Sequence, residues 1–482
     1  MTGSTVFDSF LFRDLFGTAE MRAVFDDRSY VDQVVRVEVA LAQAEARVGV
    51  IPRDSADVIA ASCDAARLDR DRLRRDTERV GYPILPIVGQ LAEHCGDAGG
   101  YLHWGATTQD IMDTATVLQC AEGLALVSDA LDRLRAHLRR LAAEHIDTVT
   151  AGRTHLQHAL PVTFGYRVAV WLSALDRHAD RLTAVRERDL MVQFGGAAGT
   201  LASLGPGPAG LRVRAELAAE LGLRDPEITW HVARDGLAEI VGLLAAIGAS
   251  VGKIGTDVAL MCSTEFGELA EPFVPGRGAS STMPQKRNPI SSELMVAAAK
   301  LLRDKSSAML DAMVQDFERA TGPWHVEWAV IAEAFLLLAS SLSQAEQAMA
   351  GLQVDAERMR ANLSLTGGLI AAEAVMMALA PEIGRQHAHK LVYAACSRVR
   401  DTGTELAVEL RKDPDVTAIL GDDRIDALCH PAGYLGSAQD MVRSAVGVAV
   451  ERTDAEDRDG VRRFKRCEEA RPRLARHPPI GG

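Results

Sequence analysis

Residues 124–141 read LALVSDALDRLRAHLRRL, and the apolar positions of this stretch decide the fold class. They recur at alternating spacings of three and four residues, at Leu124, Val127, Leu131, Leu134, Leu138 and Leu141. Such spacing places the side chains on one face of an α-helix that packs against other helices. Strand patterns are almost absent from the rest of the chain. The stretch therefore predicts a long helix in an all-α protein.

Four further stretches show the same helical period. One follows Pro161, interpreted as a helix-start proline, and its apolar positions are Phe164, Val168, Trp171, Leu175, Ala179 and Leu182. The other three cover about 235–262, 290–317 and 324–350. Five helices of this length predict an extended bundle. Because apolar residues lie on several faces, we expect partner helices from other subunits, and hence a homo-oligomer.

Changes in composition and punctuation along the chain predict its domain organisation. We expect an N-terminal helical domain over residues 1–110 and the central long-helix bundle over 111–364. A C-terminal helical domain is expected over 365–450, where Gly367, Gly368 and Pro381 interrupt the helical pattern. Residues 451–482 are rich in Arg, Asp and Glu and poor in apolar residues, which predicts a mobile tail.

Composition excludes several classes of protein. The chain has 53 basic and 66 acidic residues, a formal net charge of −13, which argues against binding nucleic acid or an anionic membrane. The longest apolar window, 240–252, is too short to span a bilayer. The seven cysteines are far apart and include no CxxC, which indicates reduced, mostly buried thiols. No export signal is visible at the N-terminus, so we expect a soluble, cytoplasmic protein.

One polar stretch, residues 278–293, reads GASSTMPQKRNPISSE and precedes an apolar helical stretch. It groups two hydroxyls (Ser280, Ser281), an ammonium (Lys286) and an amide (Asn288) around Pro284. The first N–H groups of a helix have no intrahelical partner and are available to an anion. The structural alternative is a glycine-rich loop that only caps the helix.

Two more polar clusters lie next to predicted bundle helices. The first polar cluster, residues 103–110, reads HWGATTQD and offers Thr107, Thr108 and Gln109 as donors to a carboxylate. Its structural alternative is a simple N-cap run. The second polar cluster, residues 152–159, reads GRTHLQHA and contains two histidines three residues apart. Because no cysteine or carboxylate with ligand spacing accompanies these histidines, we expect no metal site.

Together these motifs resemble the fumarase/aspartase superfamily of lyases over about residues 7–450. The 278–293 stretch is similar to the superfamily loop GSSxMPxKxN, with Ala279 at a position where glycine is usual. HWGATTQDIMDTA at 103–115 and QFGGAAGTLASLG at 193–205 look most like the branch that contains 3-carboxy-cis,cis-muconate cycloisomerase; adenylosuccinate lyase is a more distant relative. The resemblance implies three helical domains, a twenty-helix core in a homotetramer, and active sites assembled from three subunits.

The resemblance also implies roles for individual residues, without any metal or organic cofactor. Ser280 resembles the catalytic base, and Lys286 and Asn288 match residues that stabilise the substrate carboxylate as it gains charge. Glu293 matches the carboxylate that pairs with and orients the histidine at position 155. The remaining matches are expected to bind the substrate: His103, Thr107, Thr108, Gln109, Thr154, Gln157, Arg319 and, by a weaker match, Arg13.

The implied reaction is elimination from a substituted succinate, a small dicarboxylate or tricarboxylate, to give fumarate or a close relative. The bacterial cycloisomerases of this branch carry tryptophan or arginine where this chain has His155, whereas a His–Glu pair resembles the β-eliminating lyases. We therefore expect a C–N lyase acting on an aspartate-derived substrate such as nitrosuccinate. The alternatives are 3-carboxy-cis,cis-muconate cycloisomerase, an adenylosuccinate-type lyase, and a catalytically inactive structural homologue.

Overall fold

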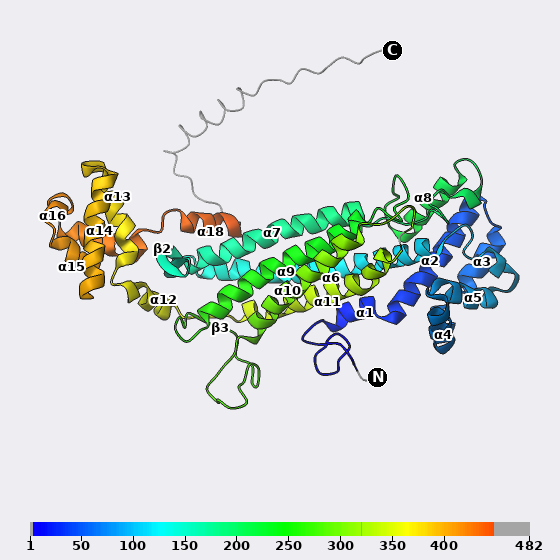
Figure 1. Ribbon diagram of the computed structural model, residues 1–482, viewed down its shortest axis with the longest axis horizontal. Helices are drawn as coiled ribbons and strands as arrows, with labels where there is room; N and C mark the ends of the chain where they lie inside the picture. The colour runs from blue at the N-terminus through cyan, green and yellow to red at the C-terminus, as the bar shows by residue number, and fades with distance from the viewer. Residues whose placement is uncertain (1–2, 320, 448–482) are drawn as a thin grey trace, which may run out of the picture.

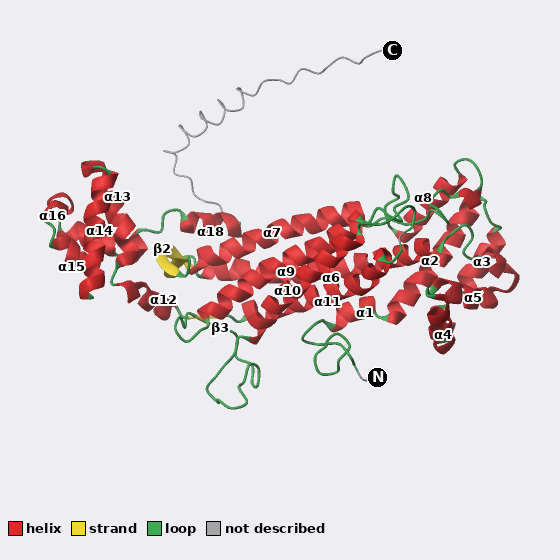
Figure 2. Cartoon of the chain, viewed as in Figure 1, coloured by secondary structure: helices red, strands yellow, loops and turns green. Residues whose placement is uncertain are grey.

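The computed structural model describes residues 3–319 and 321–447, and it is an elongated all-α molecule (Figures 1 and 2). The predicted tail at 451–482 lies outside the described residues. The helices are α1 Ala19–Phe25, α2 Asp27–Val48, α3 Arg53–Ser62, α4 Arg70–Val80, α5 Ile84–Cys95, α6 Thr108–Glu144, α7 Phe164–Asp189, α8 Ala209–Leu221, α9 Asp235–Met261, α10 Ile290–Ala312, α11 Pro323–Ala350, α12 Ala356–Leu363, α13 Ala372–Ile383, α14 Arg385–Thr402, α15 Leu406–Arg411, α16 Pro414–Leu420, α17 Asp422–Cys429 and α18 Ala438–Val446.

The five predicted long helices are present as α6, α7, α9, α10 and α11, and they lie side by side in the centre of the molecule (Figure 1). Every position of the leucine seam on α6 is at most 2% exposed, which confirms its role in the core. Two boundaries differ from the prediction. α10 ends at Ala312 rather than near Phe317, and α11 begins with Pro323 at a position where a helix does not need the N–H that proline lacks.

Two short antiparallel sheets accompany the helices. β1 (Val149–Thr154) pairs with β2 (Gln157–Thr163), and β3 (Leu269–Ala270) pairs with β4 (Gln353–Val354). The interpretation of Pro161 as a helix start is wrong, because Pro161 lies within β2 and Thr163 caps α7 by accepting a hydrogen bond from the Tyr166 N–H. The second polar cluster therefore lies on a hairpin rather than just before a helix.

The buried apolar residues form three principal cores. One runs along the central bundle, one joins α13–α17, and one joins α2–α5 to the first turns of α6. The N-terminal core also includes α8, residues 209–221, although this helix lies inside the range predicted for the central domain. The domain boundaries at 110 and 364 stay predictions.

Two central helices are more apolar than the sequence window suggested. α9 and α11, with 27 and 28 residues, are long and apolar enough to cross a membrane by length and composition, which corrects the statement that the apolar window there is too short. Two thirds of each apolar stretch, 67%, is buried inside the molecule. A helix surrounded by other helices is apolar on most of its faces, so packing in the bundle accounts for this composition.

Candidate active site

The serine loop, residues 275–289, connects β3 to α10 and is closed at its base by its own backbone. The Asn288 N–H donates to the Gly278 carbonyl oxygen at 3.0 Å, and Ala279 bridges to Arg287. Gly278 has a φ of +68°, and a Cβ at this position would collide with the Asn288 carbonyl oxygen. Only glycine fits both conditions. The Arg287 guanidinium also stacks over the Phe273 ring at 4.5 Å.

The Ser280 hydroxyl is held at the start of this loop by backbone donors. Its Oγ accepts hydrogen bonds from the N–H groups of Thr282, at 3.3 Å, and Met283, at 3.0 Å. Donors directed at an oxygen favour its charged form. The local fold thus supplies part of the stabilisation that a serine alkoxide requires.

The loop leads into a well-anchored helix start. Glu271 accepts hydrogen bonds from the N–H groups of Ser291 and Ser292 at the first turn of α10, and Arg277 donates to Ser291 and Gln344. The free N–H groups expected to bind an anion at this helix start therefore donate, in part, to the Glu271 carboxylate of the chain itself. Lys286 and Glu293 are exposed, which leaves both side chains accessible to a substrate or a neighbouring subunit.

The second polar cluster forms the tip of the β1–β2 hairpin. His155 and Leu156 are the two turn residues and have φ angles of +51° and +62°. A two-residue turn of this kind favours asparagine and glycine, because most side chains are strained there. Both residues are exposed, and strain held at an exposed histidine is typical of a functional site.

A buried ion pair anchors this hairpin. Arg153 donates two hydrogen bonds to Glu268, at 3.0 and 2.6 Å, and its guanidinium lies over the Phe266 ring. Asn362, at the end of α12, donates to the same carboxylate at 2.8 Å. Because Glu268 is fully buried, the pair fixes β1 against the segment before β3 and against α12. Thr154 and Gln157, the expected substrate-binding neighbours of His155, are exposed next to the turn.

The first polar cluster surrounds the N-terminus of α6. Asp110 is buried and accepts hydrogen bonds from the N–H groups of Thr107, Gly195 and Gly196, and it pairs with His231 at 2.6 Å. Arg319 reaches the same place, where it donates to Thr107 Oγ1 at 3.4 Å and to the Ala197 carbonyl. The structure thus brings Arg319 to Thr107, and their role in binding a carboxylate stays a prediction.

Gln109 has a different place from the one expected. It is 1% exposed, and its amide donates to Asp113 at 3.1 Å and to the His231 carbonyl at 2.9 Å. Asp113 also pairs with the buried Arg234, which binds Glu327 on α11. In this structure Gln109 belongs to the buried network that supports the site, because the α-helical period turns its side chain into the core. The substrate-binding role expected for Gln109 stays a prediction, because its amide oxygen has no partner among the described residues.

One residue next to the first polar cluster, Glu38, was not predicted from the sequence motifs. Glu38 lies 2.7 Å from His103, yet its position in the sequence is unusual, because Val34, Glu38, Leu41 and Glu45 occupy one apolar seam of α2. Glutamate at a seam position is a sign of a paired or protonated carboxyl. Arg13, by contrast, is exposed in the N-terminal segment, and no side-chain hydrogen bond joins it to the clusters within the described residues.

One chain does not bring the three clusters together. α6 has 37 residues, and at 1.5 Å per residue it separates the first cluster from the hairpin by about 55 Å. Figure 1 shows the first cluster at the α8 end of the bundle and the hairpin and serine loop toward the α12 end. No hydrogen bond or ion pair joins His155 to Glu293 in the part of the chain described, so their pairing stays a prediction for the assembled protein.

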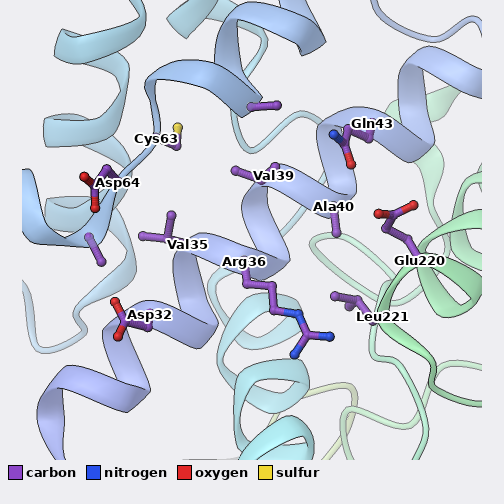
Figure 3. Close-up of a pocket in the computed structure, with 12 residues that line it drawn as sticks. Asp32, Val35, Arg36, Val39, Ala40, Gln43, Cys63, Asp64, Glu220 and Leu221 are labelled. Atoms are coloured by element: carbon purple, nitrogen blue, oxygen red, sulfur yellow. The ribbon is translucent and has the colours of Figure 1, made fainter.

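A separate hollow of about 370 Å³ lies between α2, α3 and α8 (Figure 3). Its lining includes Arg36, Cys63, Asp64 and Glu220 and none of the predicted site residues. The predicted chemistry lies in the polar clusters, not in this hollow.

The chain that carries the three clusters matches two known protein families. A family model described as lyase matches residues 16–301, more than half of the chain, and one described as adenylosuccinate lyase C-terminus matches residues 368–445. The chain belongs to the fumarase/aspartase superfamily.

Relatives of this superfamily lyase cover nearly its whole length. The chain is 46% identical to 3-carboxy-cis,cis-muconate cycloisomerase of Pseudomonas aeruginosa, over 90% of this chain and 95% of the relative. It is 38% identical to nitrosuccinate lyase of Streptomyces davaonensis, over 92% and 96%. A crystal structure of fumarate lyase from Mesorhizobium sp. BNC1 is 52% identical and superposes with a TM-score of 0.84, over 90% and 98%. These similarities confirm the all-α superfamily fold.

Proposed function

We propose that this superfamily lyase releases fumarate from a nitrogen-substituted succinate by β-elimination, without a metal or organic cofactor, and that nitrosuccinate is a substrate. The observation that carries this proposal is His155, which is held at a strained hairpin tip with its side chain exposed. The similarity to nitrosuccinate lyase over nearly the whole chain supports the same reaction.

Proton removal is assigned to Ser280. Its alkoxide takes the proton from the carbon next to one substrate carboxylate, and the N–H groups of Thr282 and Met283 stabilise the oxygen before it accepts that proton. The electron pair left on carbon moves into the carboxylate, which becomes a doubly charged aci-acid. Lys286 and Asn288 stabilise this charge as it develops.

The leaving group departs from the neighbouring carbon in the second half of the reaction. The aci-acid collapses, the carbon–carbon double bond of fumarate forms, and the carbon–nitrogen bond breaks with its electron pair on nitrogen. From nitrosuccinate the products are fumarate and nitrite. His155 binds the leaving-group side, and Thr107, Thr108 and Arg319 hold the second carboxylate. Because these groups lie about 55 Å apart along α6 in one chain, the proposal includes a homotetramer with shared sites.

The test is fumarate release from nitrosuccinate, followed by ultraviolet absorbance, with nitrite measured in parallel. Ser280→Ala is expected to lower turnover at least about a hundredfold while the fold and oligomeric state are kept. His155→Ala is expected to lower kcat more than it raises KM. The control is His387→Ala, which removes an exposed histidine of α14, and it is expected to keep full activity. Near-normal turnover of Ser280→Ala would remove Ser280 from the role of base.

The second candidate is 3-carboxy-cis,cis-muconate cycloisomerase, favoured by the 46% identity to the Pseudomonas aeruginosa enzyme. In that reaction a carboxylate of the substrate adds to its own double bond, so no separate leaving group is bound. Efficient lactonisation of 3-carboxy-cis,cis-muconate, with no fumarate formed from nitrosuccinate, aspartate or adenylosuccinate, would make this the function.

A further inference from the structure

A buried carboxylate lies directly behind the first polar cluster. Glu38, on α2, is fully buried, and its Oε1 lies 2.7 Å from Nδ1 of His103. Its other oxygen, Oε2, has no hydrogen-bond partner among the residues that the structure describes. A carboxylate removed from water in this way needs a charged or hydrogen-bonding partner, and the His103 ring provides it.

The same contact fixes the orientation of His103. A carboxylate is an acceptor, so Nδ1 carries the proton and donates to Glu38. The His103 backbone has a φ of +58°, and its side chain is 22% exposed. Within the described part of the chain Nε2 makes no hydrogen bond, so the ring is held on one side and open on the other. Strain and an open nitrogen at one residue are typical of a binding group.

The first polar cluster, which contains His103, also holds groups that attract anions, beside the buried Asp110 carboxylate. His103 lies four residues before Thr107, the N-cap of α6, and the N-terminus of a helix carries partial positive charge. The Arg319 guanidinium contacts Thr107 from the segment before α11. The helix terminus, the guanidinium and the imidazole are each groups that bind anions.

We propose that Glu38 is a positioning residue: it holds the His103 ring so that Nε2–H donates to a carboxylate of the substrate at the α6 end of the site. This inference rests on the proposed function for the identity of the anion. It adds a residue of α2 to a site whose other members come from the polar clusters.

The surrounding charges favour a cationic His103. Burial lowers the pKa of His103, but the charge and hydrogen bond of Glu38, with the charge of Asp110, outweigh burial and leave this pKa above its ordinary value. Asp110 is itself paired with His231, and Arg319 donates to Thr107 Oγ1. Glu45, further along α2, is neutral at pH 7, because burial and the nearby Glu38 raise its pKa to about 9. Glu38 is therefore the carboxylate that faces the ring.

Glu45 also provides a matched control. It lies seven residues from Glu38 on the same face of α2 and is equally buried. Glu38→Gln keeps the shape of the side chain and an acceptor oxygen for His103 but removes the charge. Glu45→Gln makes the same chemical change where no charge is present at neutral pH.

The experiment measures the reaction of His103 with diethyl pyrocarbonate, which modifies neutral imidazole, by peptide mass spectrometry from pH 5.5 to 8.5. Removing the Glu38 charge lowers the pKa of His103, so Glu38→Gln is expected to react at a pH about one unit lower than the wild type. Glu45→Gln is expected to follow the wild-type curve. Superimposed curves for Glu38→Gln and the wild type, in proteins of unchanged circular dichroism and oligomeric state, would overturn the inference.

The second measurement uses fumarate as the probe anion, with its affinity determined by calorimetry. Fumarate is expected to protect His103 from modification, and Glu38→Gln is expected to weaken fumarate binding about tenfold at pH 7.5, as loss of a charge-assisted hydrogen bond does. His103→Asn is expected to weaken binding by a similar factor, with little further loss in the double variant. Fumarate that binds without protecting His103 would overturn the inference. Absence of fumarate binding, with the Glu38-dependent reactivity intact, would count against the proposed function instead.

Discussion

Two buried carboxyl groups in the core of the N-terminal region, Glu38 and Glu45, differ in their hydrogen-bond partners. Glu38 has an imidazole within hydrogen-bond distance, whereas neither oxygen of Glu45 has a partner among the described residues. A buried carboxyl without a partner is more stable in its protonated form. Burial and the neighbouring Glu38 charge accordingly raise the pKa of Glu45 to about 9.

This difference predicts a pH-dependent effect of Glu45→Gln on stability. In the unfolded chain Glu45 ionises near its ordinary pKa of 4.5, while in the folded protein it stays protonated to about pH 9. The folded state thus binds one more proton in this window, and its stability falls as pH rises from about 4.5 to 9. Glutamine cannot ionise, so the variant is expected to gain on the wild type by ~2 °C or more between pH 6 and pH 9. Thermal unfolding monitored by circular dichroism is the measurement; parallel curves at the two pH values would contradict the prediction.

At the scale of elements, the β1–β2 hairpin depends on contacts made far along the chain. Its turn residues, His155 and Leu156, are poor choices for a two-residue turn, and the sequence therefore gives no hairpin signal. The pair between Arg153 and Glu268 holds the strand in place from outside. Tertiary contacts here outweigh the local preference of the turn.

The substitution Arg153→Leu is expected to destabilise the β1–β2 hairpin more than it destabilises the other elements. The change leaves the Glu268 carboxylate buried without its cation, which costs about 3–5 kcal/mol. Hydrogen exchange is expected to increase in peptides covering 149–163 and α12, and fumarate release is expected to fall because His155 loses its fixed position. The double variant Arg153→Leu/Glu268→Leu is the control, since it removes both charges and is expected to recover part of the protection. Equal exchange in the single variant and the wild type would show that the pair does not anchor the hairpin.

At the scale of the whole molecule, the length of the bundle determines how a site can form. Arg319 contacts the first polar cluster at the N-terminus of α6, and the serine loop, which follows β3, lies toward the α12 end of the bundle (Figure 1). The length of α6, about 55 Å at 1.5 Å per residue, separates the first polar cluster from the hairpin in one chain. We propose that the clusters at the two ends meet where chains pack with opposite directions. The homotetramer with shared sites remains our proposal for this assembly.

This proposal predicts complementation between inactive variants. Ser280→Ala and Arg319→Ala are each expected to be inactive as homotetramers. When the two chains are co-expressed and mix at random, about a quarter of the sites combine a native Ser280 with a native Arg319 from another chain, and a similar share of the activity is expected. Mixing the separately purified tetramers without exchange of subunits is the control. Inactive mixed tetramers, or an active monomer in sedimentation, would exclude shared sites.

The sequence by itself determined the features that depend on local pattern. The apolar period on α6 and its neighbours predicted the long helices, since burial of one face is encoded in the order of residues. The serine loop could be recognised from the sequence because its polar residues lie within one short stretch of the chain, together with Gly278 and Pro284. The motifs also sufficed to place the chain in its superfamily before any contact was known.

Only the tertiary structure decided which side chains meet across long separations. It paired Glu38 with His103, turned Gln109 into the core, and held His155 on a hairpin that local preference disfavours. Each of these depends on a partner 65 or more residues away, or on burial by another helix, and no local pattern records such a partner. The separation of the three clusters follows from the same cause, because the direction and length of α6 become distances only in the folded bundle.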